Sequence, residues 1–168
     1  MPESKEIVIN TSPLIAIVAA TGGLEILRSL YQNVFVTCEV GQEILTGGPE
    51  GFAVKAFEKA TWLKKLSSPL EISAYLRNSL DRGEASVIQL ALNQKIQTVC
   101  IDETVGRRIA KLSDLTVTGS IGILLRAKKE GMELSLHDAI RSMKEKGIWL
   151  SEKVIRFALQ QAGEIPRG

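Results

Sequence analysis

The chain has 168 residues, about the length of one domain, and this length can bury a core without disulfide bonds or structural metals. Hydrophobic residues make up 45% and charged residues 24% of it, a composition that excludes disorder. The two cysteines, Cys38 and Cys100, form no CxxC motif, which excludes a disulfide framework and a zinc site of the usual spacing. The sequence shows neither a long apolar stretch nor a signal-peptide pattern, so we expect no membrane association and a cytoplasmic location.

The net charge of +2 is unevenly distributed along the chain. Residues 1–103 carry 9 basic and 12 acidic side chains, whereas residues 104–168 carry 12 basic and 7 acidic ones. This division suits a carboxylate site beside a phosphate-binding surface, although charge alone favours the alternative of a few solvated basic helices. His137 is the single histidine, and we expect it to be an ordinary helical residue rather than a member of a catalytic triad.

Apolar segments typical of buried strands recur along the chain, at residues 6–10, 33–37, 97–101 and 114–118, with a weaker one at 62–66. Helical patterns occupy residues 12–30 with a break at Gly22 and Gly23, then 40–45, 50–60, 71–79, 83–94, 103–112, 121–130, 135–146 and 151–162. Gly47-Gly48-Pro49 and Gly147 separate neighbouring helices.

Strands that alternate with helices predict right-handed crossovers and a parallel sheet. We therefore predict one α/β domain with a parallel sheet of four to five strands covered by helices on both faces. Residues 1–132 would form this α/β part, and residues 133–168 a C-terminal helical pair packed on it.

Binding sites in such sheets form beyond the carboxyl ends of the strands. Asn10 ends the first predicted strand, and Asp102 follows the strand predicted at 97–101. Both residue types also favour the N-cap of a helix, so a structural role is the alternative for each.

Two glutamates lie at the apolar edges of predicted helices. Glu84 shares a face with Val87, and Glu43 shares one with Val40. A capping box with Asp81 would explain Glu84 structurally, and simple solvent exposure would explain Glu43. Clustered carboxylates repel one another unless a hard cation neutralises them, so these residues suit a Mg²⁺ or Mn²⁺ site for phosphodiester hydrolysis.

The segments IVINTSPLI, VGQEI, LDRGEASVIQLA, IDETVGRRIA and TGSIGILLRAKKEG occur in the order seen in PIN-domain proteins. The similarity covers residues 6–132, and it is closest to small prokaryotic PIN-like proteins related to the toxin ribonucleases of toxin–antitoxin modules. This resemblance implies a metal-dependent ribonuclease that acts on RNA, with an antitoxin protein as partner and assembly into a homodimer.

The resemblance also assigns roles to individual residues. It places the catalytic and metal-binding positions at Asn10, Glu43, Glu84 and Asp102, and supporting hydroxyl groups at Thr11, Ser12 and Ser120. The family usually has Asp where this chain has Asn10, and an amide brings no charge and takes up no proton. A catalytically weakened, nucleic-acid-binding or interaction module is therefore the alternative to an active endoribonuclease.

Arg107 and Arg108 follow Asp102 on the next predicted helix, where they would contact phosphates of a bound RNA. The alternative is a solvated helix face on which Glu103 pairs with Arg107. TGSIG (118–122) lacks the lysine of a phosphate-binding loop, so a tight turn explains it better. Aromatic residues are only 5% of the chain, too few for a base-stacking platform.

Overall fold

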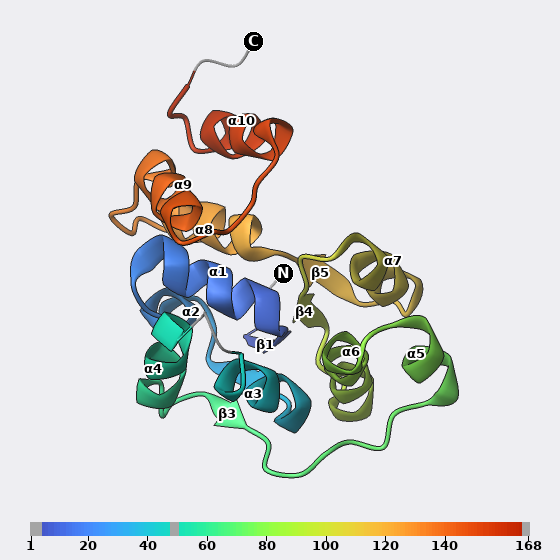
Figure 1. The fold of residues 1–168 in the computed structure, drawn as a ribbon. Helices are drawn as coiled ribbons and strands as arrows, with labels where there is room; N and C mark the ends of the chain where they lie inside the picture. The colour runs from blue at the N-terminus through green and yellow to red at the C-terminus, as the bar shows by residue number, and fades with distance from the viewer. Residues whose placement is uncertain (1–4, 48–50, 166–168) are drawn as a thin grey trace.

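The computed structural model describes residues 5–47 and 51–165 and contains a sheet flanked by helices (Figure 1). Its strands are β1 (Glu6–Ile9), β2 (Asn33–Val36), β3 (Lys64–Lys65), β4 (Thr98–Cys100) and β5 (Thr116–Thr118). Its helices are α1 (Thr11–Thr21), α2 (Glu25–Leu30), α3 (Cys38–Leu45), α4 (Gly51–Lys59), α5 (Ala74–Ser79), α6 (Arg82–Gln94), α7 (Thr104–Leu112), α8 (Ser120–Lys129), α9 (Leu136–Glu145) and α10 (Glu152–Gln161).

All five strands are parallel, in the order β3-β2-β1-β4-β5. The central strand is β1, in which Val8 pairs with Phe35 of β2 on one side and with Val99 of β4 on the other. The prediction of a parallel α/β sheet of four to five strands is thus confirmed. β2 and β3 lie on one side of β1, and β4 and β5, which follow later in the chain, lie on its other side. The strand order therefore reverses between β1 and β4. A crevice at the carboxyl ends of the strands is expected at such a switch point.

Helices cover both faces of the sheet, as predicted. On one face α6 packs against β1 and β4 while α7 packs against β5, and on the other face α1 lies with α8 and α9 (Figure 1). The side chains of Ile7, Val8 and Ile9 are completely buried. This burial on both faces explains why the first strand reads as a continuous apolar run rather than as an alternating one.

The observed boundaries differ from the predicted ones mainly where a side chain caps a helix. The helix predicted at 40–45 begins earlier, at Cys38, because the Thr37 hydroxyl accepts a hydrogen bond from the Val40 amide at 3.1 Å. The helix predicted at 71–79 begins only at Ala74, after the cap formed by Ser73. Gly22 ends α1 with a positive φ of 85°, as its break in the pattern predicted. The predicted break at Gly48-Pro49 lies outside the described residues.

The last two helices pack against α1 and α8 around a second apolar cluster that includes Leu136, Met143 and Ala158 (Figure 1). The Ser142 hydroxyl of α9 donates a hydrogen bond to the Ala19 carbonyl of α1 at 2.6 Å. The helical pair is therefore held to the first helix of the α/β part. None of the helices in residues 5–47 and 51–165 combines the length and apolar character needed to cross a bilayer.

Candidate functional site

Asn10 lies at the switch point of the sheet. Its backbone amide donates a hydrogen bond to the Cys100 carbonyl at 3.0 Å, which places the carboxyl ends of β1 and β4 side by side. Asn10 occupies the N-cap position of α1, yet its side chain forms no capping hydrogen bond with the described residues. The residue is 4% exposed, and its Oδ1 atom has no hydrogen-bond partner in the described part of the chain. The capping alternative therefore does not explain this side chain, because an unpaired buried carbonyl costs about 1–3 kcal/mol.

Glu84 lies on the first turn of α6, close to this crevice. Asp81 caps that helix by accepting a hydrogen bond from the Glu84 amide at 2.9 Å, so this part of the structural alternative is correct. The Glu84 side chain, however, is 6% exposed, and its Oε2 atom has no partner among the described residues. Burial, contact with the Asp81 carboxylate and the charges of Glu103 and Glu43 raise the pKa of Glu84 to about 8.

Glu43 reaches the same region from α3. Its side chain is exposed, and its Oε2 atom accepts a hydrogen bond from the Thr11 hydroxyl at 3.0 Å. Partial burial and the nearby Asp81 charge raise the pKa of Glu43, while the Thr11 hydrogen bond and Arg82 act in the opposite direction. This hydrogen bond connects Thr11, just after β1, to the Glu43 carboxylate. Simple solvent exposure, the structural alternative for Glu43, therefore does not describe this side chain.

Asp102 lies beyond the end of β4 and is exposed. Its Oδ1 atom accepts a hydrogen bond from the backbone amide of Ser120, the first residue of α8, at 2.8 Å. Glu103, and not Asp102, is the N-cap residue of α7, so the capping alternative is wrong for Asp102. The turn predicted at 118–122 therefore orients the Asp102 carboxylate through a backbone amide, and the Ser120 side chain is buried beside it.

Each of the three carboxylates lies against a glycine of a neighbouring element. A Cβ atom at Gly83 would collide with the Glu43 carboxylate, and one at Gly106 would collide with that of Glu84. A Cβ atom at Gly119 would lie 2.6 Å from Asp102 Oδ1. The sequence does not predict these contacts, although Gly83 lies in the segment LDRGEASVIQLA and Gly106 in IDETVGRRIA.

The oxygen atoms of this region fit a hard divalent cation. Asn10 Oδ1 and Glu84 Oε2 are both buried and lack a partner within residues 5–47 and 51–165. The same described residues contain no group of three or more His, Cys, Asp or Glu side chains placed to hold a metal ion. Magnesium keeps several water ligands and needs only one or two carboxylates, so the arrangement suits this kind of open site rather than a closed cage.

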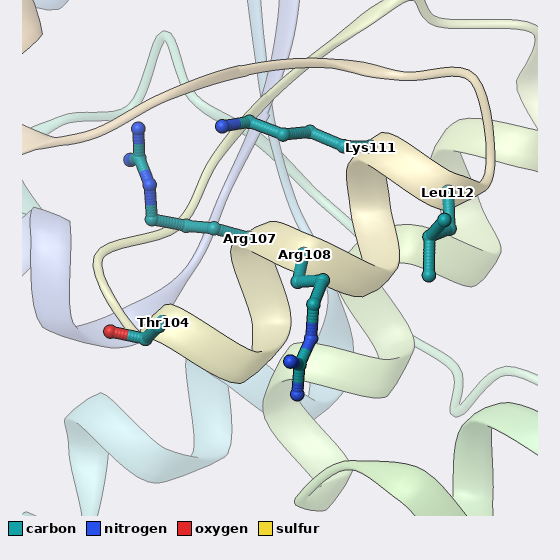
Figure 2. Close-up of a pocket in the computed structure, with 5 residues that line it drawn as sticks. All are labelled: Thr104, Arg107, Arg108, Lys111 and Leu112. Atoms are coloured by element: carbon teal, nitrogen blue, oxygen red, sulfur yellow. The ribbon is translucent and has the colours of Figure 1, made fainter.

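Arg107 and Arg108 leave α7 in different directions (Figure 2). Arg107 Nη1 donates a hydrogen bond to the Ile101 carbonyl at 2.8 Å, which differs from the Glu103 pair that the sequence offered as the alternative. Arg107, Arg108 and Lys111 line a surface pocket of about 350 Å³ together with Thr104 and Leu112 (Figure 2). Lys111 had not been singled out, although its spacing from Arg107 places both on one side of the helix.

Ser12 is exposed at the start of α1 and lines a larger groove, of about 970 Å³, together with Asp102 and Ser120. The predicted site residues thus lie around the carboxyl end of the sheet. His137 is an exposed residue of α9 beside Asp138, in agreement with the expectation of an ordinary helical position.

A family model described as "DUF3368: PIN domain" matches residues 6–164. The matched range contains the whole sheet and extends through both C-terminal helices. Comparisons with curated proteins and with solved structures gave no match.

Proposed function

Because this chain belongs to the PIN-domain family, which indicates nuclease activity in general, we propose that it hydrolyses RNA phosphodiester bonds with the help of Mg²⁺ or Mn²⁺. The observation that carries this proposal is the pair of buried, unpartnered oxygen atoms of Asn10 and Glu84 at the switch point of the sheet. PIN domains generally use divalent metals, and oxygen ligands are those that these cations prefer.

Asn10, Glu43, Glu84 and Asp102 are the residues that would hold the cation. When bound, the cation would stabilise negative charge on the attacking and leaving oxygens of the phosphodiester. The chain itself orients the donors, since Thr11 fixes Glu43 and the Ser120 amide fixes Asp102.

The protonation of Glu84 is the main electrostatic feature of this arrangement. With its pKa raised to about 8, the Glu84 carboxyl group keeps its proton at neutral pH in the protein alone. Carboxylates must lose their protons before they ligate a metal, so cation binding is expected to strengthen as the pH rises towards 8. Asn10 contributes a carbonyl oxygen at any pH, because its amide does not titrate.

The basic residues of α7 would contact the RNA backbone. Arg107 uses Nη1 to bind the Ile101 carbonyl, which leaves its other N–H groups for a phosphate. Arg108 and Lys111 line the same pocket as Arg107 and enlarge its positive surface (Figure 2). Contacts of this kind position a nucleic acid without reading its sequence.

The biological setting is part of the same proposal. By family resemblance, the chain acts as the toxin of a toxin–antitoxin pair, binds an antitoxin protein and forms a homodimer. A small antitoxin-like gene directly upstream would support this setting.

The proposal is tested by incubating the purified protein with an end-labelled RNA of mixed sequence, in Mn²⁺ and in EDTA. We expect cleavage only with Mn²⁺, and its loss in Glu84→Gln and Asp102→Asn, whereas the matched control Glu133→Gln changes an exposed glutamate outside the crevice and keeps activity. Cleavage that persists in EDTA, or in both site variants, would overturn the proposal.

One observation favours a second candidate, a module that binds RNA without cutting it. Asn10 leaves the site with one negative charge fewer than an aspartate would provide. If the native protein binds RNA without cleaving it and Asn10→Asp cleaves in Mn²⁺, this second function is correct.

A further inference from the structure

The groove of about 970 Å³ has two walls of different chemistry. One wall is polar and comes from the carboxyl end of the sheet, where its charged residues are Asp102, Glu103 and Arg107. The other is apolar and comes from the α9–α10 connection and from α10, where it includes Trp149 and Phe157. The groove therefore joins the candidate cation site to the C-terminal helices.

Trp149 and Phe157 place large apolar surfaces in contact with water. Trp149 is 83% exposed and Phe157 is 52% exposed, values that are unusual for side chains of this size. The chain contains only two tryptophans and four phenylalanines, so this groove holds a notable share of its few aromatic rings. Exposed apolar surface concentrated at one place marks a binding site more often than chance.

The backbone that carries Trp149 and Phe157 is held in place by its surroundings. Ala158, the neighbour of Phe157 on α10, is completely buried in the second apolar cluster, which fixes the rotation of this helix. Gly147 turns the chain with a φ of 85°, and the Ile148 amide donates to the Met143 carbonyl at 2.9 Å just before Trp149. The Ser151 hydroxyl then caps α10. A backbone fixed in this way loses little conformational freedom when the groove binds a ligand.

We propose that a nucleobase of the RNA strand stacks on Trp149 and Phe157 while a neighbouring phosphate contacts the Arg107 guanidinium. This inference rests on the proposed function and adds a subsite to it. Arg107 and Thr104 line both this groove and the basic pocket that contains Arg108 and Lys111, so the positive surface and the aromatic wall are continuous. A single-stranded nucleic acid matches both, since it combines phosphates with flat apolar bases.

Other occupants fit this groove less well. An apolar helix of a protein partner would cover Trp149 but would also bury Asp102 and Arg107 away from water, at a cost in desolvation. A base on an RNA strand covers the aromatic wall and leaves its own phosphate to Arg107. The low aromatic content of the chain excludes an extended base-stacking platform, but this subsite needs only two rings because it holds a single base.

The test measures binding in EDTA, where cleavage does not interfere. The probes are a labelled oligouridylate of ten nucleotides and an abasic ribose-phosphate oligomer of the same length and charge. In a Trp62→Phe background Trp149 is the remaining tryptophan, and we expect its emission to be quenched by the oligouridylate but not by the abasic oligomer.

Fluorescence anisotropy of the labelled probes then compares variants. Trp149→Ala should weaken oligouridylate binding at least about fivefold, the lower end of the range for base stacking on an aromatic side chain, and leave abasic binding within about twofold. Trp149→Phe should retain most of the affinity. The matched control is Tyr75→Ala, which removes another exposed aromatic ring, 60% exposed and on α5, and should change nothing.

The proposal is overturned if native protein binds both oligomers equally, or if Trp149→Ala binds oligouridylate like the native protein. It is also overturned if Trp149 emission changes with protein concentration alone, because a second copy of the chain would then cover the groove.

Failure of the stacking subsite and failure of the nuclease activity can be distinguished. Mn²⁺-dependent cleavage without base-dependent quenching removes only the stacking subsite, and base-dependent quenching without cleavage removes only the nuclease activity.

Discussion

The most informative single residue is Glu84, a buried carboxyl group with one oxygen that lacks a partner in the described part of the chain. Burial and the acidic neighbours raise its pKa to about 8, so folding opposes ionisation of this group. A carboxyl group that is costly to ionise in the free protein, and that has an oxygen atom without a hydrogen-bond partner, is typical of a functional site. The same features would be unfavourable in a residue with a purely structural role.

The raised pKa predicts a pH-dependent effect of Glu84→Gln on stability in EDTA. Below about pH 4.5 the folded and unfolded states both hold the proton, so native and variant should be similar. As the pH rises to 8 the unfolded state releases this proton and the folded state keeps it, so the native protein loses stability that the variant retains. We expect the variant to gain on the order of 3 kcal/mol between pH 5 and 8.

Urea denaturation at both pH values measures this difference, with Glu133→Gln as the exposed control. An advantage of Glu84→Gln that is the same at pH 5 and pH 8 would show that the carboxyl group is not held protonated.

At the scale of the elements, the site depends on glycines that let helices approach the carboxylates. Gly106 of α7 lies against the Glu84 carboxylate and against Ile101 Cγ2, and Gly83 of α6 lies against the Glu43 carboxylate. Alanine at either position favours a helix by about 1 kcal/mol in isolation. Here the added methyl group would occupy space that the carboxylate now fills.

We therefore predict that Gly106→Ala lowers the affinity for Mn²⁺ at least about tenfold, because it displaces a buried carboxylate. Gly83→Ala should also weaken binding while the fold is kept, since the exposed Glu43 side chain can move aside. The matched control is Gly41→Ala on α3, where the new methyl group meets Phe57 at an ordinary 3.7 Å. Calorimetric titration with Mn²⁺ gives the affinities, and equal affinity in Gly83→Ala and Gly41→Ala would contradict this view of the glycines.

Most of the elements were predictable because the buried strands are continuous apolar runs and because caps such as Asp81 mark the start of a helix, whereas the cap at Thr37 was missed and the start of α3 was predicted too late. The placement of Asn10 and Asp102 at strand ends was predictable for the same reason. The glycine contacts were not, since they join residues of different helices and leave no local pattern in the sequence. The aromatic wall was also missed, because an aromatic content of 5% does not indicate that Trp149 and Phe157 line the same groove.

At the scale of the whole molecule, Glu164 fastens the end of the chain to the rest of the fold. Its carboxylate accepts hydrogen bonds from Lys128 Nζ at 2.6 Å, from the Leu136 amide at 2.6 Å and from the His137 amide at 3.0 Å. Burial tends to raise the pKa of Glu164, but these hydrogen bonds and the Lys128 charge lower it to about 2. The long sequence separation of these partners is why this anchor was not predicted.

Glu164→Gln should therefore destabilise the protein by about 2–3 kcal/mol at pH 7. The lowered pKa stabilises the fold above about pH 4.5, and this contribution is lost as the pH falls towards 2. The difference between native protein and variant in urea denaturation should accordingly be much smaller at pH 3 than at pH 7, and it should vanish only near pH 2. A difference that stays constant between pH 7 and pH 3 would rule out the ionised anchor.

The central claim is that the carboxyl end of the sheet binds a divalent cation through Asn10, Glu43, Glu84 and Asp102. Its most direct test is the melting temperature of native protein and Asn10→Asp, each in EDTA and in Mn²⁺. In EDTA the variant should melt at a lower temperature, because a fourth carboxylate adds to the repulsion. With Mn²⁺ its melting temperature should rise by more than that of the native protein, because the cation gains a charged ligand and stabilises the folded state to which it binds. An Asn10→Asp protein that responds to Mn²⁺ no more than the native protein would contradict the account.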